Sequence, residues 1–383
     1  MAVIGAGIHG AGVAQAAASM GYSVCLVEQS AVAAGTSSRS SKLIHGGLRY
    51  LETAQVGLVR ECLRERRILL TIAPQLVKLI PFYIPVYRHS KRPPWQIGIG
   101  LQLYSALSGF GRDTRATRLA DSAFDALNGL TRKDLRAVFQ YYDAQTDDVR
   151  LTQAVIDSAV RYSAKLLMPA QVLKIEPRST GFELQVEHAG DRAWMAARCV
   201  VNAAGPWVNH VHQRLQDAAP PYAIDLVQGA HIVVQREAAK AAFYVESPHD
   251  RRAVFVLPWQ GLTMIGTTET AFYGDPATVT AQQSEIDYLT DCYNYYFPQA
   301  AVAAKDIQHS FAGLRVLPTA STSHNARNRE TLLLNERQRC PGYVAIYGGK
   351  LTAYRHTATR VMQILQAFLP APKQPLQTQT IKL

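Results

Sequence analysis

The chain has 383 residues, of which 48% are hydrophobic and 18% are charged; this globular composition allows two domains or one large one and excludes a disordered chain. Forty lysines and arginines against 29 acidic residues give a net charge of +11, which suits an anionic partner such as nucleic acid, an anionic lipid surface or a phosphorylated small molecule. Because this charge is not concentrated in a tail or a lysine-rich block, we do not expect a nucleic-acid-binding arm.

The cysteines indicate a reducing compartment. They are odd in number and show no CxxC pair, which argues against a disulfide framework and against a thiolate metal site. No stretch reaches the ~20 apolar residues that a membrane-spanning helix needs, and the first residues lack a basic leader and an export cleavage pattern. We therefore expect a cytoplasmic protein without a spanning segment. The five cysteines are Cys25, Cys62, Cys199, Cys292 and Cys340.

Residues 2–28 read as a dinucleotide-binding unit. A short β-type run is followed by Gly5-x-Gly7-x-x-Gly10, an alanine-rich helix and an apolar strand that ends at Glu28. Gly5 permits a tight turn, Gly7 lets the backbone approach a pyrophosphate, and Gly10 lets the helix pack close to the strand. The helix N-terminus offers unpaired N–H groups to the phosphates, and the Glu28 carboxylate can accept both ribose hydroxyls. Only four residues precede Gly5, fewer than a first strand normally has, so we expect the N-terminus to be clipped or misassigned.

The middle of the chain changes character several times. The stretch SSRSSKLIHGGLRYLE (37–52) combines basic residues, a histidine, a glycine pair and four serines without periodicity, and taken alone it is typical of a solvated loop. Residues 84–149 mix proline, aromatic residues and arginine. Residues 172–208 read as a β-meander with turns at STG and AGD that returns through the buried strand CVVNAAG. The small residues that end this strand suit a backbone that lies against a ligand.

The later segments complete the expected fold. Residues 222–309 alternate in β fashion before a polar helix, SEIDYLTDCYNYYF, and residues 342–369 read as a strand, a glycine turn and an amphipathic helix. We expect an α/β fold, with a Rossmann-type dinucleotide-binding domain and a discontinuous, largely antiparallel β substrate (cap) domain. The tail from residue 370 is expected to be a loose end. The division assigns 1–83, 150–221 and 310–383 to the first domain, and 84–149 and 222–309 to the second.

Several motifs occur in a fixed order from residue 1 to about residue 360: the opening fingerprint, TSSRSSKLIHGGLRYLE, RPPWQIGIGLQLY, YYDAQTDDVRL, NAAGPWV, FVLPWQGLTMIGTTET, FAGLRVLP and GGKLTAYRHTA. Together they resemble the FAD-dependent glycerol-3-phosphate dehydrogenases of the D-amino-acid-oxidase-like flavoprotein superfamily. The glycines and NAAGPW are shared across the superfamily, whereas SSKLIHGGLRYLE and GGKLTAYR are specific to the glycerophosphate branch. Family members commonly continue into a C-terminal helical domain, so the resemblance implies a short form.

The resemblance implies FAD as the cofactor. Thr36, Ser37 and Ser41 are then expected to hydrogen-bond the FAD phosphates or the ribityl chain. Lys350 is expected to stabilise negative charge on the reduced flavin or on the substrate. The expected cofactor-binding residues are Gly5, Gly7, Gly10, Glu28, Thr36, Ser37, Ser41, Val172, Ala204, Gly205, Gly349, Lys350 and Leu351.

The resemblance also implies a reaction: oxidation of sn-glycerol 3-phosphate to dihydroxyacetone phosphate, by hydride transfer from C2 to flavin N5. The phosphate dianion calls for converging cations, and Tyr50 is expected to orient the substrate. We assign Arg315 and Lys350 to catalysis as well as to binding, and Arg327 could take the place of Arg329. The family places its substrate-binding cations at Arg49, Arg315, Arg329 and Lys350.

A base must take the hydroxyl proton of the substrate. His231 and His45 are both candidates by their titration range. His231 lies on an alternating strand, where a histidine is more often a structural residue, and His45 lies beside the glycine pair. The pair His210 and His212 has no third ligand nearby in the sequence, so we expect no metal site.

Other functions stay open. The chain could be another flavin oxidase of the superfamily that acts on an amino or hydroxy acid, for which one carboxylate-binding arginine would suffice. It could also be a truncated flavin-binding module without activity. Both alternatives would be separated from the main prediction by bleaching of the flavin on addition of glycerol 3-phosphate.

The segment RHSKRPPWQIGIGLQLY indicates a membrane surface. A run of this kind, too short to cross a bilayer, suits a surface that dips into an anionic headgroup layer, although a segment packed on its own core is the alternative. We expect peripheral attachment at the inner face of the cell membrane, with a quinone rather than oxygen as electron acceptor. The residues concerned are the cations Arg88, Lys91 and Arg92 and the apolar or aromatic Trp95, Leu101 and Tyr104.

Overall fold

One half of the molecule is built on a six-stranded sheet in the order β18-β19-β11-β1-β2-β7. The computed structural model describes residues 1–109, 114–127, 129–236, 241–319, 331–335 and 338–383. Strand β1 lies between β2 and β11 and runs parallel to both, with Ala2 opposite Cys25 and Val200, whereas β18 is antiparallel to β19. The strands are β1 (Ala2–Ile4), β2 (Cys25–Val27), β7 (Lys165–Leu167), β11 (Val200–Asn202), β18 (Leu332–Asn335) and β19 (Tyr343–Tyr347).

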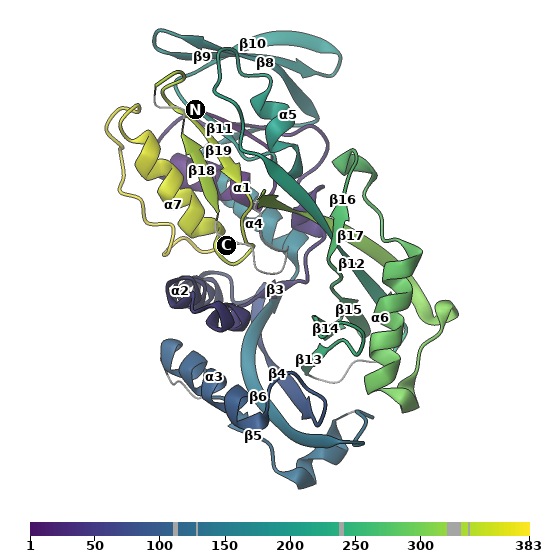
Figure 1. Cartoon of the computed structure of the whole chain (residues 1–383). Coiled ribbons are helices and arrows are strands. Elements are labelled where there is room, and N and C mark those ends of the chain that lie inside the picture. The colour runs from purple at the N-terminus through teal and green to yellow at the C-terminus, as the bar shows by residue number, and fades with distance from the viewer. Residues whose placement is uncertain (110–113, 128, 237–240, 320–330, 336–337) are drawn as a thin grey trace.

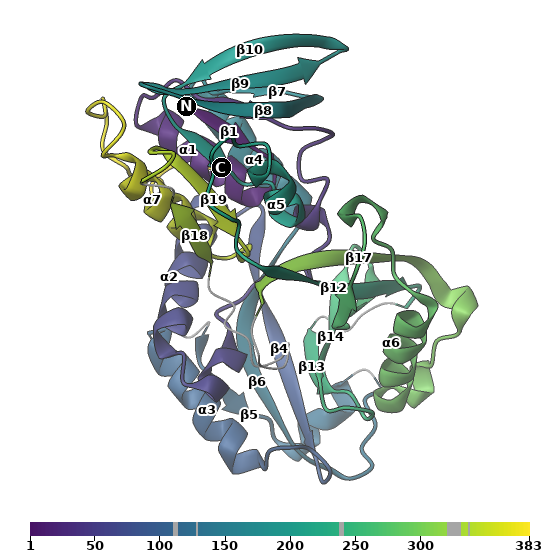
Figure 2. The ribbon, with the colours of Figure 1, turned by 45° about the horizontal axis from the view of Figure 1, so that its top comes forward.

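Helices cover one face of this sheet and a second sheet covers the other (Figures 1 and 2). Val3 packs against the helices, whereas its neighbours Ala2 and Ile4 pack on the opposite side. The meander predicted for 172–208 and the strand, turn and helix predicted for 342–369 are confirmed. The helices are α1 (Ile8–Ser19), α4 (Asp148–Arg161) and α7 (Tyr354–Leu365), and the other face holds α5 (Val208–His212) with β8 (Ala170–Arg178), β9 (Gly181–His188) and β10 (Asp191–Ala197).

The other half is built on a ten-stranded, largely antiparallel sheet (Figure 1). Its main path is β16-β12-β15-β14-β13-β4-β6-β3, with β17 paired to β12 and β5 paired to β6. Val233 packs towards α2 (Val56–Ile72) and α3 (Pro94–Leu107), whereas its neighbour Ile232 packs towards α6 (Gln283–Tyr296). The strands are β3 (Leu43–Ile44), β4 (Val77–Tyr87), β5 (Thr117–Arg118), β6 (Leu135–Thr146), β12 (Ile224–Val234), β13 (Ala242–Glu246), β14 (Ala253–Trp259), β15 (Leu262–Gly266), β16 (Thr270–Phe272) and β17 (Ile307–Pro318).

Strands β12 and β17 run from one half into the other. They pair along their whole length, from Ile224 opposite Pro318 to Val234 opposite Ile307. Ile224 packs against a core cluster of the six-stranded half, whereas Val234 packs in the cluster under α6. The architecture confirms the predicted α/β fold, in which a Rossmann-type domain is joined to a largely antiparallel β domain.

The five-segment division of the chain stays a prediction. Strand β4 begins at Val77, before the boundary expected after residue 83, and pairs with β6 along its length. Strand β17 extends to Pro318, beyond the boundary expected after residue 309. If the ten-stranded sheet defines the substrate domain, that domain reaches beyond both boundaries.

The C-terminal segment 370–383 packs on the six-stranded half, so the predicted loose end is wrong. The Leu383 N–H donates to the Ile72 carbonyl at 2.9 Å, at the end of α2. The side chain of Thr378 is buried, and its hydroxyl is bonded by Arg355 of α7. The polar, proline-containing composition of this segment gave no sign of partners that distant parts of the chain supply.

The membrane-facing surface predicted for the segment that forms α3 is wrong in two of its residues. Leu101 and Tyr104 were expected on that surface, but each is only 1% exposed and packs in the core. The exposed apolar side chains of this helix are instead Trp95 (67%), Ile99 (63%) and Leu103 (44%). Because an α-helix turns once every 3.6 residues, side chains spaced four apart share one face, opposite the buried pair. Within the described residues, no helix combines the length and apolarity needed to cross a bilayer.

Candidate active site

A cavity of about 870 Å³ lies where the two halves meet. Its wall includes the end of β1, the loops after β2 and β11, and parts of β12 and β17. Ligands of α/β proteins bind at the carboxyl ends of parallel strands, so this position is typical of a cofactor site. Apart from Gly10, every predicted site residue in the described part of the chain lines the cavity. Arg329 and Arg327 lie outside the described residues.

The glycine fingerprint forms the end of the cavity next to α1. Gly5 has a φ of +102°, and a Cβ there would lie 2.7 Å from the carbonyl oxygen of Ala203. A Cβ at Gly10 would lie 1.8 Å from the Gly5 carbonyl oxygen, so Gly10 sets the close approach of α1 to β1 without lining the cavity. A Cβ at Gly7 would lie 3.1 Å from Ser37 Oγ. Glycine at positions 5 and 7 keeps the backbone accessible to a ligand.

Glu28 follows β2 at the edge of the cavity, and backbone amides fix its carboxylate. Oε2 accepts a hydrogen bond from the Ala6 N–H at 2.8 Å, and Oε1 accepts one from the Ser30 N–H at 2.9 Å. The side chain is therefore held in one orientation before any ligand binds. Its contact with a ribose stays a prediction.

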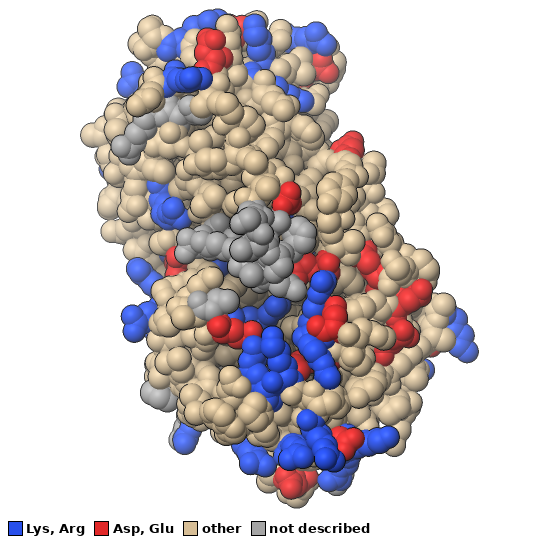
Figure 3. Space-filling model, in the orientation of Figure 1, with Lys and Arg blue, Asp and Glu red and all other residues tan. Residues whose placement is uncertain are grey.

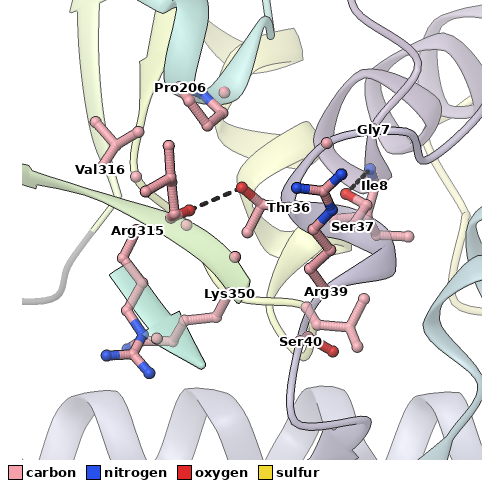
Figure 4. A pocket seen from close by; sticks show the side chains of 18 of the residues that line it. Gly7, Ile8, Thr36, Ser37, Arg39, Ser40, Pro206, Arg315, Val316 and Lys350 are labelled. Carbon is pink, nitrogen blue, oxygen red and sulfur yellow. Dashed lines mark hydrogen bonds between the residues drawn. The ribbon is translucent and has the colours of Figure 1, made fainter. Parts of the chain in front are cut away.

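The three hydroxyls of the 36–41 segment have different partners. Ser37 Oγ accepts a hydrogen bond from the Ile8 N–H at 2.9 Å, at the N-terminus of α1 (Figure 4). Thr36 Oγ1 donates to the Leu314 carbonyl of β17 at 2.7 Å. Ser41 Oγ lies 2.9 Å from Nε2 of the imidazole of His231. Ser37 is thus the hydroxyl placed beside the phosphate-binding turn.

The glycine pair of the HGG motif has a steric reason. A Cβ at Gly46 would lie 2.2 Å from the Tyr104 hydroxyl oxygen. Gly47 has a φ of +76°, and a Cβ there would lie 2.3 Å from the ring of Tyr50. Both positions therefore exclude a side chain. The pair lets the 45–50 loop lie flat against the protein while its side chains line the cavity.

A buried polar cluster is hydrogen-bonded to the 45–50 loop, and it was not predicted from the sequence. Asp143 of β6 pairs with Arg66 of α2, accepts the Gly46 N–H at 3.0 Å and accepts the Tyr104 hydroxyl at 2.9 Å. Burial, followed by the charge of Asp143, holds the pKa of Tyr104 well above its ordinary value. The cluster is nearly closed to solvent, because Arg66 and Asp143 are each at most 3% exposed.

The GGK loop meets the HGG loop in the cavity. Lys350 Nζ lies 4.3 Å from the centroid of the Tyr50 ring, a cation–π contact. Thr352 Oγ1 donates to the His45 carbonyl at 3.3 Å. Gly349 has a φ of +129°, and a Cβ there would lie 1.9 Å from Nε2 of His9. The HGG and GGK loops are therefore in direct contact.

Three of the four predicted substrate-binding cations lie in the described part of the cavity wall. Arg49 belongs to the HGG loop, Arg315 to β17 and Lys350 to the GGK loop. The side chains of Arg315 and Lys350 reach into the same part of the cavity (Figure 4). Arg315 is oriented by Thr267 Oγ1 at 3.4 Å and by Glu269 Oε1 at 3.6 Å. Glu269 is a lining carboxylate that sequence reasoning did not single out.

The histidines differ in their surroundings. His231 is 2% exposed, lies over Gly266 and stacks on Phe311 with ring centroids 4.9 Å apart. Burial, and then the charges of Arg315 and Lys42, lower its pKa to about 3. His9, which was not predicted as a site residue, has its pKa lowered to about 4 by burial.

A second buried ion pair also escaped prediction. Lys42 Nζ lies 2.6 Å from Asp148 Oδ1 and donates to the Ser38 carbonyl at 2.5 Å. Asp148 also accepts from the Ser40 hydroxyl at 2.7 Å. This pair ties the segment before the HGG loop to the first turn of α4. No local sequence signal links Lys42 to Asp148, since they are far apart in the chain.

A family model described as FAD dependent oxidoreductase matches residues 1–355. The chain belongs to this family of FAD-dependent oxidoreductases. Among its relatives, the glycerol-3-phosphate dehydrogenase of Pseudomonas aeruginosa is 40% identical over 372 residues, which cover 96% of this chain and 72% of the relative. The D-erythritol 1-phosphate dehydrogenase of Brucella abortus is 36% identical over 373 residues, which cover 96% and 74%. The crystal structure of the Bacillus halodurans glycerol-3-phosphate dehydrogenase with FAD has a TM-score of 0.77 and 28% identity, covering 100% of this chain and 66% of that one.

FAD is the cofactor of this oxidoreductase, as predicted, and the cavity fits it. Gly5 and Gly7 leave the cavity wall without side chains, and Ser37 and the Ile8 N–H stand at the helix N-terminus where a pyrophosphate binds. In addition, Nδ1 of His9 is buried on the cavity wall without a hydrogen-bond partner among the described residues. The predicted contacts of individual residues with FAD remain predictions.

Proposed function

We propose that this FAD-dependent oxidoreductase oxidises sn-glycerol 3-phosphate at C2 to dihydroxyacetone phosphate. The observation that carries the proposal is the gathering of Arg49, Arg315 and Lys350, from three distant parts of the chain, in the cavity that Gly5 and Gly7 also line. Cations of this kind bind a phosphate dianion strongly, and a single carboxylate would not require as many. The relatives that act on polyol phosphates support the same substrate class.

The chain's own residues would position the substrate. Bound FAD would supply the acceptor for the hydride from C2. Arg49 and Arg315 would hold the phosphate, and Tyr50, fixed by its contact with Lys350, would orient the carbon chain. Lys350 lies one turn before α7, so its ammonium adds to the positive potential of that helix N-terminus.

We propose His231 as the group that takes the hydroxyl proton, with His45 as the alternative. His231 lines the cavity and is neutral at pH 7, so one of its ring nitrogens has a lone pair. His45 also lines the cavity, and its carbonyl is held by Thr352.

The experiment that tests the proposal is anaerobic bleaching of the bound flavin. Glycerol 3-phosphate is expected to bleach it fully, whereas glycerol, which lacks the phosphate, is expected to do so very slowly. Faster bleaching by D-erythritol 1-phosphate than by glycerol 3-phosphate would indicate that a longer polyol phosphate is the preferred substrate. Bleaching by a D-amino or 2-hydroxy acid but not by glycerol 3-phosphate would contradict the proposal, and a yellow protein that no substrate bleaches would indicate a binding module.

For the electron acceptor, we propose a quinone reached at an anionic membrane surface. The exposed face of α3 supports this, because Trp95, Ile99 and Leu103 form an apolar stripe that follows the exposed cations Arg88 and Lys91. Figure 3 shows basic side chains grouped at the end of the molecule that holds β5 and the tip of β6. Attachment at the inner face of the cell membrane would place the protein beside its lipid-soluble acceptor.

Vesicle sedimentation tests this attachment. The protein is expected to pellet with anionic vesicles at low salt and to be released as salt rises, and replacement of Trp95 and Ile99 by alanine should weaken binding. Replacement of Trp194, a half-exposed tryptophan on β10, is the matched control. Protein that stays in the supernatant at low salt and forms stoichiometric peroxide in air would favour oxygen as the acceptor.

A further inference from the structure

The contact between Ser41 and His231 is placed for proton transfer. Ser41 Oγ lies 2.9 Å from Nε2 of His231, and both residues line the cavity. The other ring nitrogen, Nδ1, is buried and has no hydrogen-bond partner among the described residues. A proton from a ligand in the cavity therefore reaches an imidazole nitrogen most directly through the serine hydroxyl.

The imidazole itself cannot move aside. It stacks nearly parallel on Phe311, at 10° between ring planes, and it covers Gly266, where a Cβ would lie 2.1 Å from its Cδ2. The next residue in the chain after Ser41 is Lys42, which is anchored by Asp148. The imidazole is thus held by its ring contacts, and the chain beside Ser41 is anchored through Lys42, which favours the contact between hydroxyl and imidazole.

We propose that Ser41 is a catalytic residue that relays the substrate's hydroxyl proton to His231. As the C2 hydride leaves for FAD, the substrate O–H bond breaks and C2–O becomes a carbonyl. The substrate proton passes to Ser41 Oγ, and the proton of Ser41 passes to His231 Nε2, so that the imidazole ends with one additional proton. The relay rests on the proposed function, because it needs an alcohol as substrate.

The charges around His231 would couple this relay to phosphate binding. Arg315 from β17 and Lys42 from the loop both oppose an added proton on the imidazole. Lys42 is paired with Asp148 at 2.6 Å, and Arg315, which lies 3.6 Å from Glu269, is one of the proposed phosphate ligands. A bound phosphate dianion would offset the charge of Arg315, so the base would become stronger when the substrate is in place.

The first test needs no substrate. The relay requires that Ser41 donates to Nε2 in the resting protein, so the neutral imidazole must carry its hydrogen on Nδ1. Nitrogen NMR of the FAD-loaded protein with labelled histidine distinguishes the two tautomers, and His231→Gln assigns the signal. The Nδ1–H form is expected, and the Nε2–H form would overturn the relay whatever the substrate is.

The second test measures the rate at which glycerol 3-phosphate bleaches the bound FAD. Ser41→Ala is expected to slow it by about 100-fold or more, the effect typical of lost general-base catalysis, while Ser41→Thr retains a hydroxyl and most of the rate. The double variant with His231→Gln should be no slower than the slower single variant, because the two groups act as a unit. Ser38→Ala is the matched control, since its hydroxyl donates to the Gly35 carbonyl and does not line the cavity.

The outcomes separate the relay from the proposed function. A Ser41→Ala protein that is bleached at the wild-type rate, or a double variant whose losses multiply, would overturn the relay. A wild-type protein that glycerol 3-phosphate does not bleach would contradict the proposed function alone, and the tautomer would still decide the relay.

Discussion

The two walls of the cavity are built in different ways. On the dinucleotide side, the groups that shape the site come from neighbouring positions: Gly5, Gly7 and Gly10 share one turn and one helix, and the end of the next strand supplies Glu28. On the substrate side, one short loop depends on α2, α3, β6 and the GGK loop at once. A local motif can thus hold a cofactor, whereas the substrate end needs support from across the chain.

The largest expected effect tests that distant support. Asp143→Ala leaves Arg66 buried without its carboxylate and frees Tyr104 and the Gly46 N–H. Loss of one partner of a buried ion pair costs about 3–5 kcal/mol in the free energy of unfolding. Urea unfolding should show it, with Asp191→Ala on the exposed edge of β10 as the control. A loss below about 1 kcal/mol would mean that the loop does not depend on this cluster.

The cations of the substrate wall come next. Arg315→Ala and Lys350→Ala are each expected to reduce kcat/KM for glycerol 3-phosphate by about 30-fold or more, since losing a charge-assisted contact to a bound anion costs about 2–5 kcal/mol. Steady-state kinetics measures the change. Arg192→Ala removes a cation that is 63% exposed on β10 and should leave the kinetics unchanged. Unchanged kinetics in both site variants would place the phosphate elsewhere.

On the dinucleotide side, low pH is expected to destabilise the protein because His9 is buried in its neutral form. Its folded-state pKa of about 4 lies below the ordinary value of 6.5. Between these pH values His9 is therefore protonated in the unfolded chain and neutral in the folded chain. The free energy of unfolding therefore loses nothing through His9 above pH 6.5, and it falls by about 3 kcal/mol as the pH is lowered towards 4. Urea unfolding of the flavin-free protein should show a flatter pH dependence in His9→Asn. Equal slopes in the two proteins would contradict the assignment.

The smallest effect is expected at a single hydroxyl of the dinucleotide wall. Ser37→Ala removes the acceptor for the Ile8 N–H and should weaken FAD binding by about 1 kcal/mol, roughly fivefold in Kd. Titration of the flavin-free protein with FAD measures this, and Ser38→Ala is the control. If Ser37→Ala weakened FAD binding a hundredfold, the two walls would be equally sensitive to single side chains.

The difference between the walls also explains what could be predicted from the sequence. The fingerprint, the meander and the GGK helix were predicted because their spacing is local and their geometry is fixed by glycine and by strand alternation. The family and FAD followed from the same motifs and are confirmed. The contacts of Asp143 with Arg66 and of Lys42 with Asp148 could not be predicted, because no periodicity connects residues that only folding brings together.

The predictions that failed have the same cause. Leu101 and Tyr104 looked suitable for a membrane surface by composition, but the phase of α3 relative to its neighbours decides which face is covered. The C-terminal segment looked free because its partners, at the end of α2 and on α7, leave no trace in its own residues.

The long pairing of β12 with β17 has a mechanical consequence. Because this ladder continues from the core around Ile224 to the core around Val234, separating the two halves would break a run of backbone hydrogen bonds rather than bend a linker. We therefore expect heating to melt the whole protein in one calorimetric peak, and the amide hydrogens along these two strands to be among the slowest to exchange with solvent.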